Sequence, residues 1–174
     1  MYLLESAFIA IRSFFEAGGD VLWAILAVTT LMWTLIIERF WFFRWVLPGL
    51  ERRAIEEWDQ REDTTSWFAR RIRDQLISEV SVESHRYILM IKTLMAILPL
   101  LGLLGTVTGM ILVFDVMAFA GTGNARLMAG GVSAATIPTM SGLVAALSGL
   151  YLATYLERRA GKEVQRFEEM LVHH

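Results

Sequence analysis

The chain has 174 residues, of which 55% are hydrophobic, and its mean hydropathy is +0.48. This apolar share exceeds that of an ordinary soluble domain and indicates membrane spans. Sixteen Lys and Arg nearly balance eighteen Asp and Glu, and cysteine is absent. A disulfide framework and a thiolate metal site are therefore excluded.

Residues 1–17 predict an amphipathic helix that lies on the outer surface of the bilayer. Phe8 and Ile11 recur at helical spacing, whereas Glu5 and Arg12 fall on the opposite face. The segment has no basic start and no small-residue cleavage site, so we do not expect a cleaved signal peptide. Packing as a soluble amphipathic helix is the alternative.

Three windows without any charge follow, at 21–37, 93–114 and 127–156. A helix needs about 20 apolar residues to cross the hydrocarbon core of a membrane. The first window reaches this length once its aromatic continuation is included, which gives a span over 21–41. The predicted fold is therefore an all-α membrane protein with three transmembrane helices.

The basic residues set the predicted orientation. Ten of the sixteen lie between Glu38 and Lys92 and four follow Leu156, whereas Arg12 and Arg126 are the others. Because cytoplasmic loops carry the excess of Lys and Arg, the N-terminus faces outward and the C-terminus lies in the cytoplasm. The long loop 42–92 and the tail 157–174 are then cytoplasmic, and the short loop 115–126 lies outside.

The cytoplasmic loop has a mixed charge pattern that favours helices. We expect one helix break at Asp63–Ser66 and a second near Ser81–Ser84, with the last helix continuing into the second span. About fifty residues are too few for an independent core, so these helices extend the membrane helices into the cytoplasm. The arginines alternate with acids, and a nucleic-acid partner is not predicted.

Small residues recur three or four positions apart in the second and third spans. Helices in lipid associate by close backbone packing, which small residues permit. We therefore expect helix packing, within the chain and between copies of it, at Gly102, Gly105, Gly109, Gly142, Ala145, Ala146 and Gly149.

Hydroxyl side chains accompany these small residues. For a single Ser or Thr, a hydrogen bond to a carbonyl one turn back in its own helix is the commoner expectation. Together with the carbonyls that Pro99 and Pro138 leave without a helical partner, they instead suggest a polar seam that holds water. The candidate pore-lining residues are Thr106, Ser133, Thr136 and Thr139.

None of the three charge-free windows contains Asp, Glu, Lys, Arg or His. A threonine hydroxyl does not ionise near neutral pH, so a proton pathway here needs an acid from a partner. No catalytic constellation or cofactor motif is present, and we predict no enzyme activity, cofactor or metal site. His173 and His174 fit a tag remnant as well as a ligand pair.

The stretches "LLGLLGTVTGM" and "GGVSAATIPTMSGLVAAL" resemble the paired signatures of the ExbB/TolQ family, relatives of the flagellar stator protein MotA. Three spans match ExbB and TolQ, whereas MotA has four. The resemblance implies a homopentamer in the inner membrane of a Gram-negative bacterium, with a periplasmic N-terminus. It also implies an ExbD-like single-span partner whose aspartate carries the proton, and a TonB-like protein that transmits the motion to outer-membrane receptors.

By the same resemblance, Thr106 and Thr139 match the pore-facing threonines of the second and third spans. The third-span glutamate of ExbB is replaced by Ala134, so this chain is expected to rely wholly on its partner's acid. Two alternatives remain open: a TolQ-like subunit of an envelope-maintenance motor, and a non-conducting oligomeric scaffold in which the glycines serve assembly alone. A membrane enzyme is a distant third.

Overall fold

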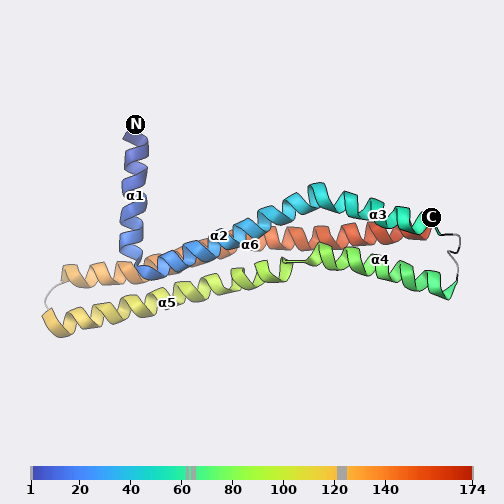
Figure 1. Ribbon diagram of the computed structural model, residues 1–174. Coiled ribbons are helices and arrows are strands. Elements are labelled where there is room, and N and C mark those ends of the chain that lie inside the picture. Colours follow the sequence, from blue (N-terminus) through green and yellow to red (C-terminus); the bar gives the residue numbers. More distant parts are fainter. Residues whose placement is uncertain (1, 62, 64–65, 121–124, 174) are drawn as a thin grey trace. The chain divides into compact units, whose positions relative to one another are not determined.

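A computed structural model describes residues 2–61, 63, 66–120 and 125–173. Over these residues every regular element is a helix, and the all-α prediction is confirmed (Figure 1). The elements are α1 (Tyr2–Gly18), α2 (Asp20–Trp41), the π-helical turn η1 (Phe42–Val46), α3 (Leu47–Asp59), α4 (Trp67–His85), α5 (Ile88–Ala120) and α6 (Ala125–His173).

Three helical stretches in the described part of the chain are long and apolar enough to cross a membrane. They are Asp20–Asp59, Trp67–Phe119 and Met128–Leu171. The first and second stretches contain more than one helical element because α2 continues through η1 into α3, and α4 precedes α5 with a short break. Each stretch covers all or nearly all of one of the three charge-free windows, so the chain is a multi-pass membrane protein.

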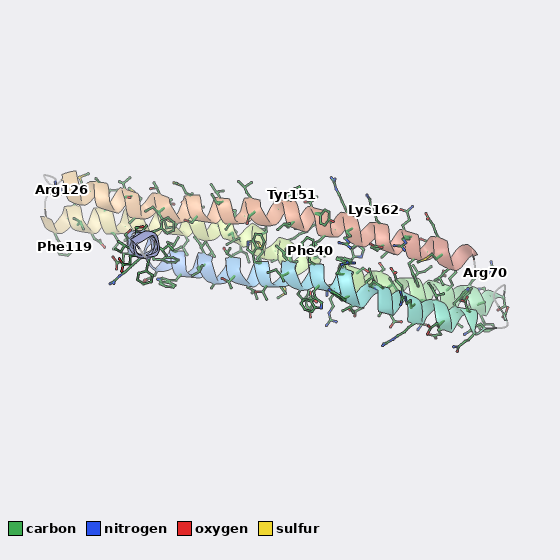
Figure 2. The ribbon with its side chains drawn as sticks, turned by 90° about the horizontal axis from the view of Figure 1, so that it is seen from above. Phe40, Arg70, Phe119, Arg126, Tyr151 and Lys162 are labelled. Carbon is green, nitrogen blue, oxygen red and sulfur yellow. The ribbon has the colours of Figure 1, made fainter. Side chains whose placement is uncertain are left out.

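The chain divides into two compact units. Unit 1 comprises Met1–Met32 and Thr93–Leu150, and unit 2 comprises Trp33–Lys92 and Tyr151–His174. In unit 1, the first part of α2 packs on α5 and α6, which run side by side and antiparallel (Figures 1 and 2). The buried apolar side chains of this unit come from all three helices: Leu22, Ile25, Met32, Leu98, Val113 and Ala135.

A sharp corner separates α1 from α2. Gly19 has a φ of +68°, a value that glycine adopts without the steric penalty of a Cβ atom, and the amide of Leu22 donates to its carbonyl at 3.2 Å. As a result α1 runs crosswise to α2, as both views show. The side chains of Phe8 and Ile11 are 68% and 57% exposed, so the apolar face of α1 is available to lipid.

In unit 2, α2 passes into α3 through the π-helical turn η1. The amide of Leu47 donates to the carbonyl of Phe42, five residues back, which is the π-helical pattern. Pro48 follows at once and has no amide hydrogen to donate, which accounts for a disturbed hydrogen-bond ladder at this point. The turn buries both Phe42 and Phe43.

The rest of unit 2 is built from amphipathic helices. The buried residues of α3 are Leu47, Glu51, Ala54 and Trp58, spaced three or four apart so that they share one face. Among the residues buried on the other helices are Leu76 and Val80 of α4 and Leu156, Ala160, Phe167 and Leu171 of α6. An ion pair of 2.6 Å between Lys92 and Glu157 joins α5 to α6 within this unit.

Two helix breaks lie in the segment that the sequence predicts as the cytoplasmic loop. The first separates Asp59 from Trp67, and Ser66 accepts a hydrogen bond from the amide of Ala69 at 3.2 Å as an N-cap. The second falls at Arg86 and Tyr87, just beyond the expected position, and Tyr87 has a φ of +62°. The two helices on either side of it, α4 and α5, are therefore separate elements.

Candidate functional site: the α5–α6 helix pair

The α5–α6 contact in unit 1 brings two backbones together at glycine positions. A Cβ atom built on Gly102 would lie 2.9 Å from the Cα of Thr139, and one built on Gly109 would lie 2.6 Å from the Cα of Ala135. One built on Gly105 would collide with the ring of Pro138. Since real Cβ atoms do not approach backbone atoms this closely, this contact admits only glycine without a shift of the helices.

The predicted packing residues of α6 have different neighbours. A Cβ atom on Gly142 would lie 2.5 Å from the carbonyl oxygen of Leu98 on α5, and one on Gly149 would lie 2.5 Å from the sulfur of Met32 on α2. Ala145 and Ala146 are half-buried. Ala145 lines an apolar groove with Thr29 of α2 rather than touching a glycine. Gly142 thus packs on α5 and Gly149 on α2.

Thr139 makes a hydrogen bond from one helix to the other. Its hydroxyl donates to the carbonyl of Gly102 at 2.8 Å, at the point where the missing side chain of Gly102 lets the helices approach. The hydroxyl oxygen keeps its capacity to accept a hydrogen bond. A single side chain therefore links the two motifs that the sequence singled out.

Two of the other three candidates, Thr106 and Thr136, bond within their own helices. Thr106 donates to the carbonyl of Leu103 at 2.6 Å, and Thr136 donates to the carbonyl of Ser133 at 3.1 Å. The side chain of Ser133 is exposed. Thr108, which is not one of the four candidates, donates to the carbonyls of Leu104 and Gly105 at 3.1 Å each. Of the four candidates, the structure joins Thr139 alone to the opposite helix.

Thr136 lies on an exposed face of α6 that is turned away from α2. Ala145, on the α2 side, lies nine positions further along α6. At about 100° per residue this is two and a half turns, so Thr136 and Ala145 lie on opposite sides of the helix. Its neighbours along the same face are Val132, Leu143 and Leu147, which are 47%, 48% and 65% exposed. We call Val132, Thr136, Leu143 and Leu147 the Thr136 face.

A buried arginine in unit 2 escaped the sequence analysis. Arg39 is 2% exposed, and its guanidinium binds both carboxylate oxygens of Glu38, at 2.6 and 2.8 Å. It also donates to the carbonyl of Glu83 at 2.8 Å, near the end of α4, and stacks on Phe42 and Tyr87 at 4.3 and 5.1 Å. Arg39 lies just past the first charge-free window, and no local sequence pattern indicates a distant carbonyl partner for it.

Glu51 is a second buried charge in unit 2. It is 9% exposed, and its Oε1 atom has no hydrogen-bond partner. Burial raises the pKa of this carboxyl above its ordinary value of 4.5, and the nearby carboxylate of Glu163 raises it further, while Arg166 opposes the shift. Glu163 is itself paired with Arg159 and Arg166, at 3.8 and 3.5 Å.

Within the described residues, no group of three or more His, Asp or Glu side chains is placed to hold a metal ion. His174 and the side chain of His173 lie outside the described residues. The charge-free windows of the helix pair hold no Asp, Glu, Lys, Arg or His, so their polar groups are hydroxyls and backbone carbonyls. Such groups donate and accept hydrogen bonds but do not carry a proton as a charged acid does.

Comparison with known sequences agrees with this arrangement. A sequence model of the MotA/TolQ/ExbB proton channel family matches residues 46–169, which include α5 and most of α6. The chain belongs to the MotA/TolQ/ExbB proton channel family. The resemblance read from the glycine and threonine motifs is therefore confirmed.

Two curated relatives from Synechocystis sp. share part of this region. The putative biopolymer transport protein ExbB-like 3 is 39% identical over 70 residues, which are 39% of this chain and 33% of that protein. The putative biopolymer transport protein ExbB-like 1 is 35% identical over 81 residues, 45% of this chain and 32% of that protein. The match thus spans about a third of the length of each relative.

Proposed function

We propose that this chain is the channel-forming subunit of a proton-driven motor in the inner membrane of a Gram-negative bacterium. Several copies, five by the ExbB resemblance, surround the membrane helix of an ExbD-like single-span partner. The partner's aspartate carries the proton, and the motion of the complex energises TonB-dependent transport across the outer membrane. Unit 2 and the end of α6 lie on the cytoplasmic side, in agreement with their share of the Lys and Arg residues.

The observation that carries the proposal is a hydroxyl-bearing helix pair whose charge-free windows, 93–114 and 127–156, contain no acid. Thr139 joins α5 to α6 through Gly102, and Thr136 and Thr106 lie on the same two helices with their hydroxyls satisfied by backbone carbonyls. Each hydroxyl oxygen still has a lone pair with which to accept a hydrogen bond from water or from a protonated carboxyl. These hydroxyls can form hydrogen bonds with a group that carries the proton, but they cannot carry the proton themselves.

In this proposal the partner's membrane helix packs against the Thr136 face. The Thr136 face is exposed in the single chain, and it is apolar apart from the threonine. An apolar helix with one acid fits such a face better than water or a charged segment does. Ala134, which stands where ExbB has a glutamate, leaves the partner's carboxylate as the titrating group at this depth.

The energy available is sufficient for a conformational motor. One proton that crosses a potential of 100 mV releases about 2.3 kcal/mol. This shifts a two-state equilibrium roughly fiftyfold, since 1.4 kcal/mol corresponds to a factor of ten. Formation of a covalent intermediate is not required for such a change.

Proton flux into vesicles tests the proposal. The chain is reconstituted with its ExbD-like partner, a potential is applied, and internal pH is followed with a dye, together with TonB-dependent uptake in cells. Thr139→Val and Thr106→Val should lower both readouts, and Thr139→Ser should retain them because it keeps the hydroxyl. Ser148→Ala is the matched control, since the hydroxyl of Ser148 bonds the carbonyl of Ala145 in its own helix on the α2 side.

Undiminished flux and uptake in both valine variants would favour the non-conducting scaffold, in which the glycines serve assembly alone. A complex that conducts protons and supports envelope integrity, but not TonB-dependent uptake, would assign the chain to the TolQ-like motor instead. At the genetic level, a neighbouring reading frame for a single-span protein with an aspartate in its membrane helix would favour a proton-driven motor over the scaffold.

A further inference from the structure

A groove of about 580 Å³ lies at the corner between α1 and α2, away from the α5–α6 pair. One wall is a single face of α1, and the other is the start of α2. Arg12 lies on this face beside Phe8 and Ile11, so the sequence-based expectation that it falls on the opposite face is wrong. The ring of Phe15 packs on that of Trp23 with centroids 4.6 Å apart, so the walls are in contact with each other. The groove is lined by Phe8, Ile11, Arg12, Phe15, Glu16, Gly19, Asp20, Trp23 and Leu26.

The groove crosses the boundary between the polar and apolar zones of the membrane. Asp20 is the last charged residue before the first charge-free window, which begins at Val21, and this places it at the level of the lipid headgroups. Leu26, six residues further along α2, lies about 9 Å deeper at 1.5 Å per residue. Trp23 lies between these levels, in the interfacial zone where tryptophan is enriched.

The charges gather at the shallow end of the groove. Arg12 and Glu16 form an ion pair of 2.8 Å with exposed side chains, and Asp20 adds a second carboxylate. The three residues therefore carry a net charge of −1, from one cation and two anions. An anionic headgroup is repelled by this sum, whereas a headgroup with a phosphate and an ammonium group finds an opposite charge for each.

We propose that this groove is a binding site for a zwitterionic phospholipid with a primary ammonium headgroup, that is, a phosphatidylethanolamine. The phosphate binds the guanidinium of Arg12, and the ammonium group donates hydrogen bonds to the carboxylates of Glu16 and Asp20. One acyl chain follows Trp23 and Leu26 into the hydrocarbon. A choline headgroup has no N–H donor and makes the same charge contacts without the hydrogen bonds.

The polarity of the groove distinguishes a lipid from a protein occupant. A membrane helix of a second copy passes the headgroup level and the hydrocarbon with a continuous surface about 10 Å wide, and it needs an apolar face along its whole length. This groove instead offers charges at one end and aromatic and aliphatic side chains at the other. An amphiphile with one head and a flexible chain matches both ends.

Native mass spectrometry of the purified full chain tests the site, with phosphatidylethanolamine, phosphatidylglycerol and phosphatidylcholine as probes. The wild type should retain phosphatidylethanolamine above the other two. The double variant Glu16→Gln/Asp20→Asn should lower the ratio of phosphatidylethanolamine to phosphatidylglycerol about two- to fivefold, the range expected for partly exposed ion pairs. Glu5→Gln, on the same helix but outside the groove, should leave the ratio unchanged.

A second measurement locates the lipid and does not depend on headgroup preference. Phosphatidylethanolamine with brominated acyl chains, at a low fraction in vesicles, should quench the fluorescence of the wild type more than that of Trp23→Phe. Equal retention of all three lipids by every variant overturns the proposal. So does disulfide cross-linking of Ile11→Cys between two copies, because a second chain then occupies the groove.

Discussion

Substitution of Gly109 by alanine tests the close contact between α5 and α6 most simply. The new Cβ atom would lie 2.6 Å from the Cα and 2.8 Å from the amide nitrogen of Ala135. Carbon atoms in ordinary contact are about 3.5–4.0 Å apart, so the two backbones must separate by about 1 Å. Because the obstructing atoms belong to the backbone, no side-chain rotation relieves the contact.

The expected cost follows from two opposing terms. Forced expansion of a packed contact costs about 1–3 kcal/mol, and alanine in place of glycine within a helix returns about 0.5–1 kcal/mol. Gly109→Ala should therefore lower the free energy of unfolding by about 1–2 kcal/mol. Gly130→Ala, on α6 and with open space around the new Cβ atom, should be neutral or slightly stabilising.

Both variants can be unfolded by titration of SDS into detergent micelles, with helix content followed by far-ultraviolet circular dichroism. Equal stability of Gly109→Ala and the wild type would refute the packing argument. A loss of the same size in Gly130→Ala would also contradict it, since the effect would then reflect glycine content rather than contact.

Three further predictions concern single side chains. Glu51→Gln should stabilise the protein near pH 7 and lose this advantage as the pH falls toward 4. The pKa of Glu51 is higher in the folded than in the unfolded protein. The stability that protonated Glu51 provides is therefore complete below the unfolded-state pKa and is lost as the pH rises through the folded-state pKa. Thermal unfolding from pH 4 to 8 measures this, with exposed Glu56→Gln as control, and a constant difference across that range would contradict it. Arg39→Lys should lower the free energy of unfolding by about 1–3 kcal/mol, because the bidentate contact with Glu38 and the bond to the carbonyl of Glu83 cannot both be kept; limited proteolysis near Arg86 should quicken, whereas Arg52→Lys, on the exposed side of α3, should not change it. Thr139→Val should cost only about 0.6 kcal/mol in the same SDS titration, the usual worth of a hydrogen bond between membrane helices, and a loss several times larger would show that its effect on proton flux is structural.

The helical architecture could be predicted from the sequence because charge-free windows of this length have few other solutions in a membrane. The N-cap at Ser66 could also be predicted, since its hydroxyl accepts a hydrogen bond from an amide only three residues further along the chain. The break at Arg86 and Tyr87 lies a few residues after its predicted position near Ser81–Ser84. Beside this break, the carbonyl of Glu83 accepts a hydrogen bond from Arg39, 44 residues earlier in the chain, and no local pattern contains that contact.

The candidate site shows the same limit. Small residues at four-residue spacing predict close packing, but they do not tell which helix each one meets, and Gly142 and Gly149 meet different partners. For the hydroxyls, the local expectation describes Thr106 and Thr136, whereas Thr139 crosses to Gly102. That bond depends on the register of two helices, which hydropathy does not specify. Nothing in the sequence distinguishes Glu51 from the other acids of this charged segment. It is buried because it lies on the face of α3 that packs in unit 2.

The central claim is that the Thr136 face receives a partner's membrane helix, and site-directed disulfide cross-linking tests it most directly. The chain has no cysteine, so a single one can be introduced without removing others. Thr136→Cys should cross-link in membranes to a cysteine placed beside the aspartate of the ExbD-like partner, and Ala145→Cys, on the opposite side of α6, should not. Cross-linking through position 145 but not 136, or through neither in an intact complex, would contradict the account.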